Sequence, residues 1–243
     1  MGGSTVVGML GGLAVRRIPH SMNDIILGFS AGVMLAAAVF GLITPAFAGE
    51  GTVFVPVLGV VAGAAMVSVL DRLVPHLHKI LGTDGEGRAT GGTVGKTLLF
   101  VAAVALHKIP EGLATGVSFG TEELGDLAVV AGSVSLQNVP EAFVVVAPLV
   151  SVGVSAPRVA GISLAIAAVS MVSVVAGCLL VSWFSSAVAF MLSLAGGAML
   201  YVISDEMIPE THSHGYEKQA TFALISGFLL VIVLQRFLEH FMR

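Results

Sequence analysis

Charged residues are scarce in this sequence. Asp, Glu, Lys and Arg make up only 11% of the 243 residues, against roughly 25% in an ordinary soluble domain, whereas 56% of the residues are hydrophobic. This deficit excludes a water-soluble globular domain and indicates an integral membrane protein. The formal net charge is −4 and the chain has no basic run, which excludes nucleic acid as a partner.

Cysteine and nucleotide-binding patterns are nearly absent too. Cys178 is the single cysteine, and one thiol can form neither a disulfide framework nor a Cys-based metal cluster. The segment "TGGTVGKT" at 90–97 imitates the end of the phosphate-binding pattern G-x-x-x-x-G-K-[ST], but Thr90 stands where its first glycine is required. ATP hydrolysis is therefore disfavoured.

Apolar runs long enough to cross a bilayer, about 20 residues each, recur along the chain. They lack the period-2 alternation of barrel strands, so a transmembrane barrel is the weaker alternative. The first run is short and has no basic segment and cleavage site of a signal peptide, so we expect a start further upstream or a shortened chain. We predict an all-α integral membrane protein with one transmembrane domain over 1–243 and eight helices, at 1–15, 25–47, 53–70, 97–119, 127–150, 159–183, 186–208 and 221–238.

Basic residues are distributed unevenly between the two sides of such a bundle. The side that holds the loops after the first, third, fifth and seventh helices is rich in basic residues, whereas the other side has only Arg236 and Arg243. By the positive-inside rule the richer side is cytoplasmic, and both termini then face outward. The loops after the first, third, fifth and seventh helices contain Arg16, Arg17, Arg72, Lys79, Arg88, Lys96, Arg158 and Lys218.

The longest loop, about 79–96, lies on the cytoplasmic side in this topology. Its Gly, Thr and charge content predicts a flexible linker without a core of its own. Cations could collect near it, although a solvated helix end is the simpler interpretation of the polar residues there: Asp71, His76, His78 and Asp84.

Two of the apolar runs contain the same polar pattern around a proline. His107 and Glu111 are four residues apart, so on a helix they project from one face and can share a ligand. Each proline leaves a carbonyl without its helical N–H, that of Leu106 or Leu136, and should kink the helix. The first run, "ALHKIPEGLATG", places His107, Lys108 and Glu111 around Pro110, and the second, "SLQNVPEAFVVVAPL", places Gln137, Asn138 and Glu141 around Pro140.

Three interpretations compete for these buried groups. A structural salt bridge from Lys108 to Glu111 or Glu141 would join two helices but leaves His107 without a role. A proton relay would use intramembrane His and Glu, yet it does not explain why an imidazole and two carboxylates meet beside amides. A divalent-cation site explains the whole set, because imidazole and carboxylate suit zinc, iron and manganese and, with a thioether, cadmium.

The seventh predicted helix has a polar end. Uncompensated charge is costly at the depth of Asp205 and Glu206, so we predict that these two are functional, on a path for the ion. The residues after them fit a path or a hydrated helix terminus equally well. The segment "AGGAMLYVISDEMIPETHSHG" contains Asp205, Glu206, Glu210, His212 and His214.

This segment also resembles the second predicted helix, "AGVMLAAAVFGLITPAF". Met34 and Met199 occupy similar places before Pro45 and Pro209. The similarity indicates an internal repeat, which is common in membrane transporters.

The motifs "HKIPEG" and "QNVPEA" resemble the paired His-Asn-x-Pro-Glu-Gly and x-Asn/Asp-x-Pro-Glu-Gly signatures of the ZIP (Zrt/Irt-like) divalent-metal transporters, and "DEMIPETH" is similar to that family too. The resemblance extends over essentially the whole chain. It implies a ZIP-like bundle of eight helices in the plasma membrane, with both termini outside, that assembles as a homodimer. The implied activity is alternating-access transport of zinc, or of cadmium, iron or manganese, into the cytoplasm, with the ion as substrate and no cofactor.

The resemblance also implies a metal site between the fourth and fifth helices, at His107, Glu111, Glu141, Met34 and Gln137 or Asn138. Many family members hold a second metal, completed by the Asn after the histidine and by a Glu in the sixth helix. Here Lys108 replaces that Asn, and Ser170 or a neighbour stands in place of the Glu. We therefore expect one metal, with the ammonium of Lys108 in place of the second ion.

Two rival functions use the same ligands. A membrane-embedded metalloenzyme would activate water at the metal, but its H-E-x-x-H motif has a Glu beside the first His, where this chain has Lys108. A gated metal channel would differ only in turnover and saturation. We predict a transporter and not an enzyme.

Overall fold

The structure is a computed structural model that describes residues 2–15, 19–48, 52–80, 105, 107–119, 124–151, 153–184 and 187–241. Within these ranges the chain is helical and contains no strand. The elements are α1 (Gly2–Ala14), α2 (His20–Ala36), η1 (Ala37–Ile43), α3 (Thr44–Ala48), α4 (Phe54–Ile80), α6 (Leu124–Ser151), α7 (Ala156–Trp183), α8 (Val188–Val202), η3 (Ile203–Met207), α9 (Ile208–Thr211) and α10 (Glu217–Phe241). Residues 107–118 form a further helical segment.

The predicted all-helical class is confirmed for the described residues. Five stretches are long and apolar enough to cross a bilayer: His20–Ala48, Leu127–Ala147, Ala156–Trp183, Val188–Thr211 and Glu217–Phe237. Gly2–Ala14 and Phe54–Leu70 are shorter apolar helices. The count of eight spans stays a prediction, because residues 97–104 of the fourth one lie outside the described residues.

Several helices extend beyond the apolar runs that predicted them. α2 begins at His20 rather than at 25, and α4 continues to Ile80 rather than ending at 70. An apolar run marks only the part of a helix that can sit in hydrocarbon, whereas backbone hydrogen bonding continues into polar sequence. The side chains of Asp71, His76 and His78, together with Asp84 and the rest of the predicted loop at 81–96, lie outside the described residues.

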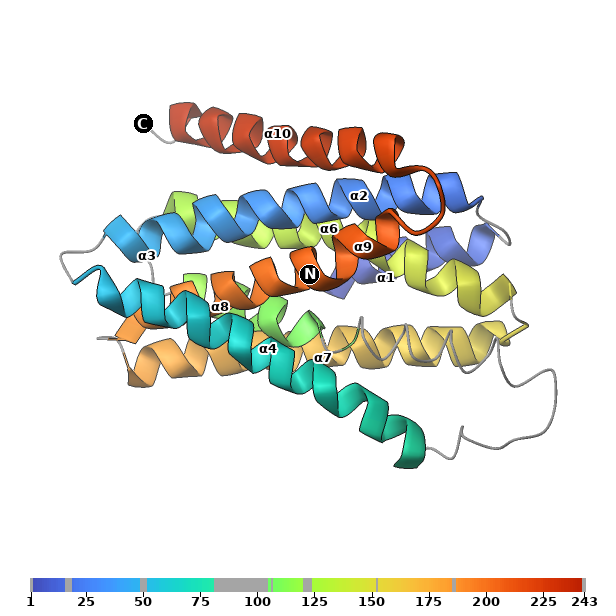
Figure 1. Ribbon diagram of the computed structural model, residues 1–243, viewed down its shortest axis with the longest axis horizontal. Coiled ribbons are helices and arrows are strands. Elements are labelled where there is room, and N and C mark those ends of the chain that lie inside the picture. The colour runs from blue at the N-terminus through green and yellow to red at the C-terminus, as the bar shows by residue number, and fades with distance from the viewer. Residues whose placement is uncertain are drawn as a thin grey trace.

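The helices are layered around a central group formed by α2, α6 and α8. In Figure 1, α10 lies along α2 at one edge of the bundle, and α4 and α7 lie at the opposite edge. Glycines allow the closest of these contacts, because a Cβ at Gly32 would overlap the carbonyl of Leu224 in α10, and one at Gly63 would overlap that of Leu194 in α8. Lipid supplies no hydrophobic force between helices, so small residues at such crossings are typical of membrane proteins.

Two helices pass through π-helical turns at matching places. η1 leads into α3 with Pro45, and η3 leads into α9 with Pro209. Each proline lacks the N–H that would close the preceding α-helical turn, and π turns occur often at functional sites. The similarity between the second and seventh predicted helices therefore has a structural counterpart.

Candidate metal site

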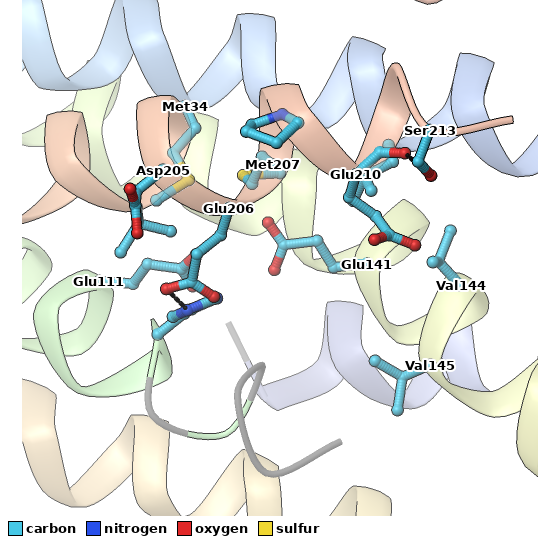
Figure 2. A pocket seen from close by; sticks show the side chains of 14 residues that line it. Met34, Glu111, Glu141, Val144, Val145, Asp205, Glu206, Met207, Glu210 and Ser213 are labelled. Carbon is cyan, nitrogen blue, oxygen red and sulfur yellow. Dashed lines mark hydrogen bonds and ion pairs between the residues drawn. The ribbon is translucent and has the colours of Figure 1, made fainter. Parts of the chain in front are cut away.

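A cavity of about 440 Å³ lies among α2, the helical segment 107–118, α6 and the end of α8 with η3 and α9. Figure 2 shows the carboxylates of Glu111, Glu141 and Glu206 directed toward it from three different segments. Its wall carries acidic, imidazole and thioether groups among apolar ones. The lining residues are Leu27, Met34, His107, Glu111, Glu141, Val144, Val145, Val202, Asp205, Glu206, Met207, Pro209, Glu210 and Ser213.

Lys108 connects the two halves of the doubled motif. Its Nζ donates hydrogen bonds to Glu111 Oε2 at 2.6 Å, to Asn138 Oδ1 at 2.6 Å and to Glu141 Oε2. An ammonium has three donors, so these bonds use all of them. Lys108, Glu111, Asn138 and Glu141 are all buried, and a buried charge of this kind persists only when it is paired and hydrogen-bonded.

The other two carboxylate oxygens also have donors. Gln137 Nε2 donates to Glu111 Oε1 at 3.0 Å, and Ser30 Oγ is 3.3 Å from Glu141 Oε1. Both glutamates are therefore oriented through both of their oxygens. One positive charge stands against two negative charges, which leaves this cluster with a net charge of −1 when all three groups are ionised.

His107 contacts Glu206 of η3, which also lines the cavity. Its Nε2 lies 2.6 Å from Glu206 Oε1, the contact drawn as a dashed line in Figure 2. This contact joins the helical segment 107–118 to η3. The predicted site residue and the predicted path residue are thus direct neighbours.

Met34, another member of the predicted ligand set, lies fully buried in α2 and lines the same cavity as His107, Glu111 and Glu141. The two predicted amides are buried but do not line this cavity: Gln137 is bonded to Glu111 and Asn138 to Lys108. Among the described residues, no three His, Cys, Asp or Glu side chains converge closely enough to hold a metal ion as they stand. The reason is geometric, since Lys108 holds the glutamates and Glu206 holds His107.

The predicted path residues separate into two groups. Asp205, Glu206 and Glu210 line the cavity. His212 instead turns back on its own helix end, with Nδ1 2.8 Å from the carbonyl oxygen of Ile208. His214 Nδ1 lies 3.1 Å from Asp24 Oδ1 of α2.

Met34 apart, sequence reasoning missed the polar residues that α2 contributes near this site. Asp24 is completely buried, and its Oδ2 has no hydrogen-bond partner within the described chain. His20 stacks on His214 with ring centroids 4.7 Å apart, and Ser30 reaches Glu141. The available signal was polar residues at the edge of an apolar run, "HSMNDIILGFS".

Ser170, the expected stand-in for a glutamate of a second metal site, lies buried on α7 with no hydrogen-bond partner for its Oγ in the described residues. Its backbone carbonyl faces Gly112 of the helical segment 107–118. No carboxylate therefore comes from this position of α7.

Apolar helices that enclose a cavity with carboxylate and imidazole side chains in its lining indicate a membrane transport protein. Intramembrane ionisable groups are costly and mark substrate or ion pathways, and repeated helices broken near the site are typical of secondary transporters.

Comparisons with known proteins specify the family. The family model for the ZIP zinc transporter matches residues 75–235. The chain is 38% identical over 243 residues to "Zinc transporter GufA" of Myxococcus xanthus, and the alignment covers 96% of this chain and 94% of that protein. It is 36% identical over 239 residues to "Zinc transporter ZIPB" of Bordetella bronchiseptica, and this alignment covers 95% of this chain and 76% of that protein.

The chain belongs to the ZIP family. It is a multi-pass membrane transporter and not an enzyme, so the metalloenzyme alternative is set aside.

Proposed function

We propose that this protein carries zinc across the membrane into the cytoplasm by alternating access, binding one ion at a time. His107, Glu111 and Glu141 bind the ion, and Met34, Gln137 and Asn138 assist. The relatives named as zinc transporters support zinc as the substrate. The imidazole and carboxylate donors also suit iron and manganese and, with the thioether, cadmium.

The observation that carries this proposal is that His107, Glu111, Glu141 and Met34 line one cavity. Zinc binds imidazole nitrogen and carboxylate oxygen, and the cavity offers both, with the thioether of Met34 beside them. Gln137 adds a completely buried amide oxygen that accepts no hydrogen bond from the described residues. Such an oxygen is suited to a cation.

The side chains proposed to bind the ion are hydrogen-bonded or ion-paired to one another and to their neighbours in this structure. Lys108, Gln137 and Ser30 hold the two glutamates, while Glu206 holds His107. A dication that enters the site replaces these contacts with its own bonds to His107, Glu111 and Glu141. His107 turns from Glu206 to the ion, and the released Glu206 becomes the next acceptor on the path.

Charge balance favours a single ion. Glu111 and Glu141 contribute two negative charges and Lys108 one positive charge, so one dication already makes the cluster positive by one unit. A second dication beside Lys108 would meet strong repulsion without a further carboxylate, because Ser170 stands on α7 where an acid would be needed. Lys108 thus replaces the second ion.

The path into the cytoplasm runs along Asp205, Glu206 and Glu210, toward the helix end that carries His212 and His214. These three carboxylates, from η3 and α9, line the same cavity as the proposed ligands, which supports their place on the path. Eight spans, both termini outside the cell, a plasma-membrane location and a homodimeric assembly belong to the same proposal.

Metal uptake into proteoliposomes tests the function directly. The unmodified protein should show saturable zinc uptake, and Glu141→Ala should abolish it, since this change removes a ligand shared by the ion and Lys108. Glu217→Gln is the matched control, because Glu217 is an exposed carboxylate in the first turn of α10. Normal saturable uptake by Glu141→Ala would contradict the proposed site, and uptake that rises linearly with zinc would favour the gated channel.

A further inference from the structure

A second, much smaller cavity lies beside Lys108, between α1, α6 and α7. It has a volume of about 10 Å³, which is room for about one water-sized group. It is lined by Thr5, Lys108, Asn138, Ala142, Val145, Ser163 and Ile166. Of these two cavities, the large one is lined by His107, Glu111 and Glu141, and the small one by Lys108.

Two polar atoms of this wall have no hydrogen-bond partner within the described chain, Ser163 Oγ and Asn138 Nδ2. Ser163 is 4% exposed and Asn138 1%, so neither can turn to solvent. Buried polar groups are usually hydrogen-bonded, and an exception requires a physical reason. Ser163 Oγ can accept a hydrogen bond and lines the same small cavity as Lys108, which suggests a state in which the ammonium donates to it.

Binding of a dication to the proposed site creates the need for such an acceptor. The dication and the Lys108 ammonium would share Glu111 and Glu141, and like charges at that distance repel. Movement of Lys108 away from the carboxylates lowers the repulsion but leaves two of its three donors without partners. A buried ammonium without partners is costly, so the movement requires a nearby oxygen.

We propose that the small cavity is a second position for the Lys108 ammonium, occupied while a dication is bound to Glu111 and Glu141. Asn138 Oδ1 is an acceptor in both positions, and Ser163 Oγ becomes an acceptor in the second. The inference rests on the proposed function and assigns Ser163 as a positioning residue that acts on metal affinity through Lys108. Ser163 itself does not touch the ion.

If this proposal holds, replacing Ser163 affects the zinc-bound protein and not the metal-free protein. Ser163→Ala removes an acceptor that is unused without metal, so the free energy of unfolding of the metal-free protein should be unchanged or slightly higher. Zinc binding should weaken about tenfold, the scale of a lost hydrogen bond to a charged group. A merely structural role for Ser163 would instead destabilise the metal-free protein.

The test measures zinc affinity by calorimetry and metal-free stability by thermal unfolding, on the full-length protein in detergent. Ser173→Ala is the matched control, because Ser173 is a buried serine of α7 whose Oγ already donates to the carbonyl of Val169. Ser163→Ala should lose about tenfold in affinity and Ser173→Ala should not. In a Lys108→Met background, Ser163→Ala should have no further effect on zinc affinity.

Each alternative outcome has a distinct meaning. If Ser163→Ala binds zinc like the unmodified protein, or loses equal affinity with and without Lys108, the second ammonium position is wrong and the proposed function stands. If the unmodified protein binds no zinc, the proposed function fails and the inference fails with it.

Discussion

Lys108 provides the sharpest single perturbation, because Lys108→Met removes its charge while keeping a long side chain. At the 2.6 Å separation of Lys108 Nζ and Glu111 Oε2, an effective dielectric constant of ~20 gives an attraction of about 6 kcal/mol. Desolvation of the three buried groups offsets much of it. Loss of one partner from a buried ion pair typically costs about 3–5 kcal/mol, and we expect a decrease of this size in the free energy of unfolding.

Zinc should reverse much of this loss. In Lys108→Met a dication supplies the positive charge that both glutamates lack, so added zinc should stabilise the variant more than it stabilises the unmodified protein. Transport should nevertheless fall, because without the ammonium the two carboxylates repel each other and no longer hold the geometry that the ion requires. The ammonium and the dication thus use the same pair of carboxylates.

Chemical unfolding in detergent, with a chelator or with excess zinc, measures both effects. Lys218→Met is the control, since Lys218 is exposed near the start of α10 and exposed substitutions usually change stability by less than about 0.5 kcal/mol. A metal-free Lys108→Met protein as stable as this control would refute the charge argument. Equal stabilisation of both proteins by zinc would refute the sharing of carboxylates.

Two further predictions concern pH and helix packing. Uptake should weaken as external pH falls from about 7.5 to about 5.5, because imidazole must be neutral to bind a metal; a flat uptake profile in proteoliposomes over that range would remove His107 from the ligand set. Gly63→Ala should lower the free energy of unfolding by about 1–3 kcal/mol, since its Cβ would overlap the carbonyl of Leu194. Gly132→Ala in α6, where a Cβ meets nothing within 4 Å, should be neutral or stabilising by up to about 1 kcal/mol, and similar unfolding midpoints for the two variants would contradict the packing argument.

The sequence predicted the helical class and the two motifs because both are local patterns. Low charge and long apolar runs are visible without tertiary information. His107 and Glu111 share a helix face by spacing alone, and the structure places both in one cavity wall. Repetition of the pattern around Pro140 identified Glu141 for the same reason.

The contacts that link distant segments could not be predicted from spacing. Ser30 reaches Glu141 across 111 positions of sequence, and His214 reaches Asp24 across 190. The pairing of His107 with Glu206 likewise joins segments that the sequence treated separately, as a site and as a path. Such pairs depend on how α2 and η3 pack against the motif helices, which local periodicity does not specify.

The helix boundaries show a related difference. Hydropathy predicted an end at 70 for the third helix, yet α4 continues to Ile80, because a polar helix can continue where the bilayer ends. The π turns η1 and η3 could not be predicted from hydropathy either, although Pro45 and Pro209 mark where each one gives way to α-helix.

Anomalous scattering from crystals of the unmodified protein soaked with cadmium tests the central claim most directly. Cadmium accepts the same imidazole, carboxylate and thioether ligands, and its position can be located independently of the protein atoms. We expect one strong peak bounded by His107, Glu111 and Glu141, with the Lys108 nitrogen, not a second ion, on the far side of the glutamates. Two strong peaks within about 4 Å of each other, the separation typical of two-metal sites, would contradict the account.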